Sequence, residues 1–162
     1  VEVGDYISLE SHVYCGTCRP CRLGKAHLCK KTIYPGVSFD GGFAEYVTVP
    51  SQIAWKNPPE LPIEVAAMME PFGIAVHSSL AGSGVSGKTV LVNGCGPIGL
   101  MNVATLCALG ATLIIACDIN PLRLSTAEKM GADRVVNASE EDLQAVIRDI
   151  TGGDGVDVAI EY

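Results

Sequence analysis

The sequence predicts an α/β protein whose second half contains part of a parallel sheet, and two observations lead to this fold class. Apolar runs suited to buried strands recur after residue 88, at 89–92, 112–118, 134–136 and 156–160. Segments with the apolar spacing of helices separate these runs, at 97–109, 121–130 and 143–150. Because crossovers of this length join parallel strands through right-handed connections, we expect a doubly wound sheet.

The first of these strands leads into glycines spaced as in a dinucleotide-binding loop. Gly94-Cys95-Gly96-Pro97-Ile98-Gly99 fits the pattern Gly-x-Gly-x-x-Gly. Gly94 permits a tight turn, Gly96 lets the backbone approach a pyrophosphate, and Gly99 lets the helix that begins there pack on the sheet. The N–H groups at the start of that helix would face the phosphates. A glycine-rich turn that binds no nucleotide is the competing interpretation.

The second strand ends in an acidic residue, Asp118. At this distance from the glycines a carboxylate accepts hydrogen bonds from the 2′-hydroxyl of the adenosine ribose. No Arg or Lys follows Asp118 immediately to bind a 2′-phosphate. The pattern therefore predicts NAD rather than NADP as the cofactor.

Residues 82–89, Gly-Ser-Gly-Val-Ser-Gly-Lys-Thr, also fit the pattern of a phosphate-binding P-loop. Such a loop requires a strand before the glycines and a helix after the lysine. Here a helical segment precedes the glycines and a strand follows them. We therefore interpret this stretch as a turn into the first strand of the sheet.

Four cysteines in the first half follow the spacing Cys-x2-Cys-x2-Cys-x7-Cys, namely Cys15, Cys18, Cys21 and Cys29. Four thiolates so close in sequence can surround one Zn²⁺ tetrahedrally at about 2.3 Å, with no open position for water or substrate, so the predicted site is structural. Disulfides are the alternative, and the odd total of seven cysteines argues against them. The other three, Cys95, Cys107 and Cys117, are expected as small core residues.

The first half has the turn and strand signals of a β-rich domain. We expect strands over 1–9, after the turn that starts at residue 40, and over 52–56. From residue 62 the spacing is helical, and we expect Glu70-Pro71-Phe72-Gly73 to interrupt the helix before it resumes over 74–80. Glu70 at this break is either a capping or surface group or a carboxylate beside a metal. The expected domains are residues 1–80 and 81–162.

Charge limits the classes of partner. The 162 residues carry a formal charge of −7, which argues against nucleic acid or an anionic membrane surface as the main partner. No apolar run approaches the roughly 20 residues that a membrane span needs. A non-catalytic zinc module that binds a partner or nucleic acid remains an alternative because the cysteine loop is locally basic, with Arg19, Arg22, Lys25, Lys30 and Lys31.

The combination of these motifs closely resembles the zinc-dependent medium-chain alcohol dehydrogenases. The resemblance extends over essentially the whole chain and includes Val3-Gly4-Asp5, Ser11 to Gly16, His27-Leu28-Cys29, Gly42 to Tyr46, and Glu70 to Gly73 with Ala75-Val76-His77. It implies a partial Rossmann-type parallel sheet, preceded by part of a β-rich GroES-like catalytic domain with a zinc lobe at 15–29. It also implies a cytoplasmic enzyme that assembles as a homo-oligomer, a tetramer in this family.

The resemblance further implies roles for individual residues. Glu70 would lie next to a catalytic zinc and assist ligand exchange or proton relay, and His12 would lie near the substrate pocket. The four cysteines of the loop would bind structural zinc, and Arg123 would contact NAD beside the adenosine. The other implied NAD contacts are Gly94, Gly96, Pro97, Ile98, Gly99 and Asp118.

The implied activity is oxidation of a secondary alcohol with hydride transfer to NAD. Within this superfamily the sequence is most similar to the threonine-oxidising branch, for which the product is 2-amino-3-oxobutanoate. A polyol or a simple alcohol is the alternative substrate, since Ile74 stands where that branch is expected to have Asn. Both ends look incomplete, and the ligands of the catalytic zinc are expected before residue 1. The chain by itself is therefore not expected to be an active catalyst.

Overall fold

The computed structural model describes all residues, 1–162, as two compact units, Val1–Glu70 and Pro71–Tyr162. The division precedes the boundary expected after residue 80 because helix α3 (Met69–Leu80) belongs to the second unit from Pro71 onward, where Asn102 donates a hydrogen bond to the carbonyl of Ala75. The domain limits themselves stay a prediction. None of the helices has both the length and the apolar character needed to cross a bilayer.

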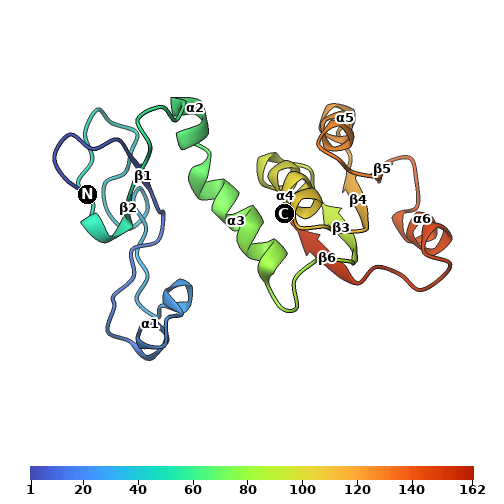
Figure 1. Ribbon diagram of the computed structural model, residues 1–162, viewed down its shortest axis with the longest axis horizontal. Coiled ribbons are helices and arrows are strands. Elements are labelled where there is room, and N and C mark those ends of the chain that lie inside the picture. Colours follow the sequence, from blue (N-terminus) through green and yellow to red (C-terminus); the bar gives the residue numbers. More distant parts are fainter. The chain divides into compact units, whose positions relative to one another are not determined.

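The second unit is built on a four-stranded parallel sheet with the order β5-β4-β3-β6 (Figure 1). Its strands are β3 (Thr89–Asn93), β4 (Leu113–Asp118), β5 (Arg134–Asn137) and β6 (Val158–Glu161). The register aligns Leu91 of β3 with Ile115 of β4 on one side and with Ala159 of β6 on the other. The winding direction therefore reverses at β3, and the parallel, doubly wound sheet expected from the sequence is confirmed.

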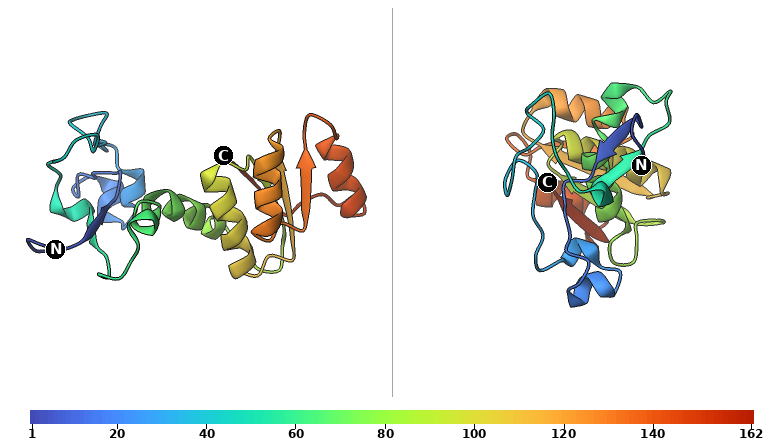
Figure 2. Two further views of the ribbon diagram at one scale, coloured as in Figure 1. Left: turned by 90° about the horizontal axis from the view of Figure 1, so that it is seen from above. Right: turned by 90° about the vertical axis from the view of Figure 1, so that its left-hand side faces the viewer.

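Helices cover both faces of this sheet, with one layer of helices on each side (Figure 2). One face packs against α4 (Pro97–Ala108) and α5 (Pro121–Lys129), and the other against α6 (Leu143–Ile150). Alternation along each strand divides the core: Val90 and Val92 point to the first face, and Leu91 points to the second. The carboxyl ends of all four strands lie at one edge, where a doubly wound sheet binds its ligand.

The cysteines of this unit only partly match the expectation. Cys95 and Cys117 are buried, as expected for small core residues, whereas Cys107 is exposed. Cys107 lies near the end of α4, where its Sγ is 3.3 Å from the carbonyl oxygen of Gly131. Cys107 is exposed because neighbouring residues of a helix point in different directions, and in this turn Leu106 is the residue that faces the core.

The first unit contains little regular structure. Strand β1 (Ile7–Leu9) pairs antiparallel with β2 (Ala54–Lys56), and the helical segments are α1 (Arg19–Arg22), η1 (Ala26–Leu28), η2 (Ser51–Ile53) and α2 (Ile63–Ala66). Ser8 and Asn57 connect these pieces, since Ser8 Oγ donates to the Ala66 carbonyl at 2.9 Å and accepts from Asn57 Nδ2 at 2.8 Å.

Two strands expected in this unit are absent or shorter. Residues 1–6 form a turn and irregular backbone, and residues 43–49 form bends and irregular backbone despite their alternating pattern. Phe43 and Tyr46 are almost fully exposed. An alternating pattern produces a strand only when another strand lies alongside to accept its backbone hydrogen bonds, and no segment of this chain pairs with 43–49.

The prediction that Glu70-Pro71-Phe72-Gly73 interrupts the helix is wrong. Helix α3 runs continuously over Met69–Leu80, and the interruption falls earlier, at residues 67–68. Pro71 is tolerated because it is the third residue of the helix, where a backbone N–H has no partner within the helix in any case. Glu70 therefore belongs to the first turn of α3 and not to a kink.

The stretch that fits the P-loop pattern is a turn, as expected. Strand β3 follows directly after Lys88, so no helix N-terminus is available to bind a phosphate. The Lys88 ammonium donates to Ser83 Oγ at 2.5 Å and to the Gly84 carbonyl at 2.7 Å. The lysine thus closes its own turn.

Candidate functional site

The glycine loop between β3 and α4 has distinct requirements at its three glycines. Gly94 has a φ of 98°, a conformation that favours glycine, and a Cβ there would clash with the carbonyl oxygen of Tyr162. A Cβ on Gly99 would clash with the carbonyl oxygen of Gly94, whereas a Cβ on Gly96 would meet no protein atom within 4 Å. Gly94 and Gly99 are therefore needed for packing, and Gly96 faces open space.

Helix α4 begins at Pro97, with Gly96 as its N-cap, as the helical spacing over 97–109 predicts and two residues before the third glycine. Proline suits the first helical position because its fixed φ matches the helix and its missing N–H would have no helical partner. The N–H groups of the following residues point out of this N-terminus, which favours a negatively charged ligand.

A cleft of about 470 Å³ lies in front of this loop, at the carboxyl edge of the sheet. All the residues expected to contact NAD line it: Gly94, Gly96, Pro97, Ile98, Gly99, Asp118 and Arg123. The sequence interpretation missed Asn93, Cys117, Ile119, Ala138 and Tyr162, which also line it. Their common signal is a position at or just after the carboxyl end of a strand, which identifies the ligand side of a parallel sheet.

The carboxylate of Asp118 is held from several sides at the end of β4. Its Oδ1 accepts from the backbone N–H groups of Ile119 at 2.7 Å and Asn120 at 2.8 Å, and its Oδ2 accepts from that of Cys95 at 2.8 Å. Arg123 lies 3.5 Å from Oδ2. Burial raises the pKa of Asp118, but the backbone donors and Arg123 outweigh burial, so the pKa is lowered overall. Asp118 is therefore an ionised acceptor at the wall of the cleft.

The position of Arg123 bears on whether the site could bind a cofactor that carries a 2′-phosphate. The sequence contains no basic residue immediately after Asp118, but the first turn of α5 brings the Arg123 guanidinium next to the carboxylate. About half of the Arg123 side chain remains exposed, at 51%. A cation that lines the same cleft is thus available beside the acid, a proximity that the sequence spacing did not show.

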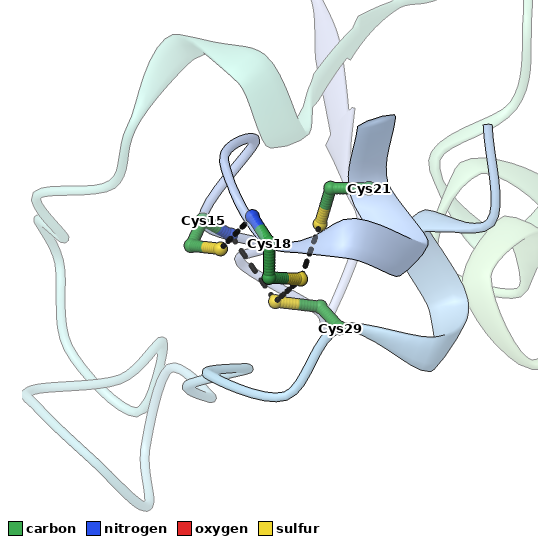
Figure 3. A group of neighbouring side chains, drawn as sticks. All are labelled: Cys15, Cys18, Cys21 and Cys29. Atoms are coloured by element: carbon green, nitrogen blue, oxygen red, sulfur yellow. Dashed lines mark hydrogen bonds between the residues drawn. The ribbon is translucent and has the colours of Figure 1, made fainter. Parts of the chain in front are cut away.

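The four cysteines of the first unit converge around a single point (Figure 3). All four Sγ atoms lie within 4.8 Å of one another, with Cys18 Sγ 3.4 Å from Cys21 Sγ and 3.9 Å from Cys29 Sγ. Four sulfurs bound at about 2.3 Å to one zinc would lie about 3.8 Å apart in a regular tetrahedron. Disulfide-bonded sulfurs are about 2.05 Å apart, and all four cysteines are free thiols. The cluster therefore fits a structural zinc.

Backbone N–H groups around the cluster favour thiolates, the form of cysteine that binds zinc. The N–H group of Cys15 points to Cys29 Sγ at 3.3 Å, and that of Cys18 points to Cys15 Sγ at 3.4 Å (Figure 3). The N–H group of Lys31 also points to Cys29 Sγ, at 3.3 Å. Backbone N–H donors of Thr17 and Cys18 lower the pKa of Cys15 to about 5. Burial, together with neighbouring thiols, raises the pKa of Cys21 to about 12. The backbone N–H donors therefore favour the thiolate form at Cys15 and Cys29, whose pKa values are both lowered.

Glu70 and His12, expected near a catalytic zinc and a substrate pocket, lie in one hydrogen-bonded group of the first unit. Ser11 Oγ donates to Glu70 Oε1 at 2.5 Å and lies 2.9 Å from His12 Nδ1, which is also 3.0 Å from Glu10 Oε1. Because the single hydroxyl proton of Ser11 goes to Glu70 and the Glu10 carboxylate only accepts, His12 Nδ1 carries the proton, and Ser11 Oγ and Glu10 Oε1 are its two acceptors. The result is a continuous chain from the imidazole through a hydroxyl to a carboxylate.

The same group has the donor atoms of a cation site. Glu10, His12 and Glu70 offer ligand atoms within 4.8 Å of one another, and all three residues are half-buried. The His12 ring packs edge-on against Tyr34 at 5.1 Å between ring centroids. The sequence did not predict Glu10 and Ser11 as members of this site. Their only signal in the sequence is that they directly precede His12.

Family models match both units. The model for zinc-binding dehydrogenases matches residues 97–162, and the model for the alcohol dehydrogenase GroES-like domain matches residues 1–60. The chain belongs to the zinc-dependent medium-chain alcohol dehydrogenases, as the resemblance implied.

Similar proteins support the same family. L-threonine 3-dehydrogenase of Pyrococcus abyssi is 48% identical over 162 residues, which are all of this chain and 46% of that protein. An alcohol dehydrogenase structure from Escherichia coli, complexed with NADH, has a TM-score of 0.90 and 36% identity over 99% of this chain and 47% of its own. A zinc-binding dehydrogenase from Sinorhizobium meliloti, bound to NADP, has a TM-score of 0.88 and 34% identity over 99% and 48%. The chain spans about half the length of these relatives.

Proposed function

We propose that this chain supplies the structural zinc lobe and the coenzyme-binding loop of an NAD-dependent dehydrogenase that oxidises L-threonine to 2-amino-3-oxobutanoate. The observation that carries the proposal is the placement of Asp118 and the glycine loop on one cleft. The choice of threonine is supported by the 48% identity to proteins named L-threonine 3-dehydrogenase. The tetrameric assembly and the cytoplasmic location implied by the family resemblance remain predictions.

Four features of the cleft have a definite task in this proposal: the start of α4, Gly96, Asp118 and Arg123. The start of α4 binds the pyrophosphate, and Gly96 leaves room for it. Asp118 accepts hydrogen bonds from the hydroxyls of the adenosine ribose, and Arg123 lies at the same rim. When bound, NAD would supply the hydride acceptor, and a catalytic zinc would supply the charge that lowers the pKa of the substrate hydroxyl.

The hydrogen-bonded group of the first unit has a matching task. Oxidation of the hydroxyl releases one proton in addition to the hydride. The chain from His12 Nδ1 through Ser11 to Glu70 can hold and pass such a proton between a ring nitrogen and a carboxylate. The four cysteines stabilise their loop by binding a second, structural zinc.

The test measures NADH formation by the protein extended to the full length of its relatives. L-Threonine, sorbitol and 2,3-butanediol are compared as substrates with NAD and NADP. We expect the highest kcat/KM with threonine and NAD. Turnover of sorbitol or butanediol without threonine activity would overturn the substrate, and the absence of any NAD-dependent oxidation would overturn the enzyme class.

A further inference from the structure

Tyr162 is packed against the glycine loop from the β6 side. Its N–H donates to the carbonyl of Asn93 at 2.9 Å, and its own carbonyl contacts the face of Gly94 that lacks a side chain. Its ring Cδ2 lies 3.5 Å from the place that a Cβ of Gly99 would take. The same residue lines the dinucleotide cleft. Tyr162 thus forms part of the wall that the glycines shape.

The hydroxyl of Tyr162 is oriented by Ser78 of α3. The two hydroxyls form a short hydrogen bond, and Ser78 Oγ also lies 3.0 Å from the carbonyl oxygens of both Ile74 and Ala75. Ser78 has one hydroxyl proton, which these helix carbonyls take. Ser78 must then accept from Tyr162, so the phenol proton points to α3 and the phenol oxygen keeps a lone pair for a further donor.

The strand order indicates which half of the cofactor lies next to Tyr162. Asp118 ends β4, on one side of β3, and Tyr162 follows β6, on the other side. A dinucleotide that crosses the carboxyl end of β3 places its adenosine at Asp118 and its other half above β6. The nicotinamide riboside half carries hydroxyl and carboxamide donors, which suit an acceptor oxygen.

We propose, on the basis of the NAD-binding function proposed above, that Tyr162 binds the nicotinamide riboside half of the cofactor as a hydrogen-bond acceptor and that Ser78 is its positioning residue. Burial raises the pKa of Tyr162, although the Ser78 hydrogen bond opposes the shift, so the phenol stays protonated at neutral pH. The proton stays available to Ser78, and the oxygen stays available to the cofactor.

The test compares the affinities of NADH, ADP-ribose and ADP for the wild-type chain and for Tyr162→Phe and Ser78→Ala. Loss of one net hydrogen bond corresponds to roughly a 3- to 10-fold change in affinity. We expect Tyr162→Phe to weaken NADH binding by about that factor and to leave ADP binding unchanged, because ADP lacks the nicotinamide riboside half. Ser78→Ala keeps the Tyr162 phenol but removes the hydrogen bond that orients it. We therefore expect this variant to weaken NADH binding too, by a smaller factor than Tyr162→Phe.

Tyr46→Phe is the matched control, because Tyr46 is exposed in the first unit, and it is expected to change none of the affinities. The thermal midpoint of each variant shows whether the fold is retained. Equal losses of NADH and ADP affinity, or no loss of either in Tyr162→Phe, would overturn the role of Tyr162 while the NAD proposal stands. If the wild-type chain binds neither NADH nor ADP, both proposals fail.

Discussion

The carboxylate of Asp118 accepts a hydrogen bond from the backbone N–H of Cys95 across 2.8 Å. This contact joins the end of β4 to the glycine loop that follows β3, two segments that are 23 residues apart in sequence. The group that would bind the adenosine ribose and the loop that would bind the pyrophosphate are therefore fixed to each other before any cofactor arrives. Such preorganisation lowers the entropic cost of binding.

Replacement of Asp118 is expected to change the cofactor preference. Asp118→Ser removes the ribose acceptor and leaves Arg123 unpaired at the same rim, where it can bind a 2′-phosphate. A hydrogen bond to a charged group contributes about 1.5–3 kcal/mol, so NADH affinity is expected to fall roughly 10- to 150-fold. NADPH affinity is expected to rise relative to NADH, as measured by fluorescence titration of both cofactors. The double variant with Arg123→Gln is the control, and a preference for NADPH that survives in it would contradict this role of Arg123.

The lowered pKa of Asp118 makes its contribution to stability dependent on pH. Its folded pKa lies below the ordinary value of 3.8, so the ionised carboxylate stabilises the fold above that value, and the contribution is lost as pH falls through the folded pKa. Asp118→Asn removes this dependence. We expect the difference in unfolding free energy between wild type and variant to be constant from pH 7 to about pH 5 and to shrink below about pH 4. Urea denaturation at pH 7, 5, 4 and 3 measures it, and an undiminished difference at pH 3 would refute the assignment.

Two glycines of one loop are expected to respond in opposite ways to alanine. In Gly96→Ala the new Cβ meets no protein atom, so stability changes by at most about 1 kcal/mol through the weaker N-cap, whereas NADH binding is lost because the Cβ fills the approach to the pyrophosphate. In Gly99→Ala the Cβ clashes with the carbonyl oxygen of Gly94, so the thermal midpoint drops with an overpacking cost of about 1–3 kcal/mol or more. Calorimetry and NADH titration of both variants separate the two effects. Retained NADH affinity in Gly96→Ala would show that the phosphates bind elsewhere.

The features predictable from sequence are those that local spacing determines. The glycine triplet, the acid at the end of β4 and the cysteine spacing each lie within a short segment, so the chain itself specifies their geometry. The proximity of Tyr162 to Gly94 and of Ser11 to Glu70 depends on contacts between distant segments. No periodicity contains that information.

The incorrect expectations have the same physical origin. An alternating pattern at 43–49 indicates which faces a strand would have, but the strand needs a neighbour, and this chain provides none. A proline usually ends a helix, but Pro71 lies in the first turn of α3, where its missing N–H has no consequence. Sequence can suggest a helix boundary only to within a few residues, and here that uncertainty decided how Glu70 was interpreted.

The zinc lobe provides the most direct test in the first unit, because loss of one ligand has a local effect. Cys21→Ser removes one of four ligands, and we expect the single zinc of the wild-type chain to be lost on dialysis against a chelator. Cys107→Ser is the matched control, since Cys107 is an exposed cysteine of the second unit, and it is expected to keep the zinc. Elemental analysis counts the metal.

Limited trypsin digestion then reports whether the metal folds its loop. Between its cysteines the lobe has two bonds that trypsin can cut, after Arg22 and after Lys25, and we expect them to be cut several-fold faster in Cys21→Ser than in the control. The affinity for NADH should not change, because the nucleotide cleft is lined only by residues of the second unit. A metal-free wild-type chain whose mass is lower by the hydrogens lost in two disulfides would instead establish the disulfide alternative. Equal zinc content in both variants would show that Cys21 is not a ligand.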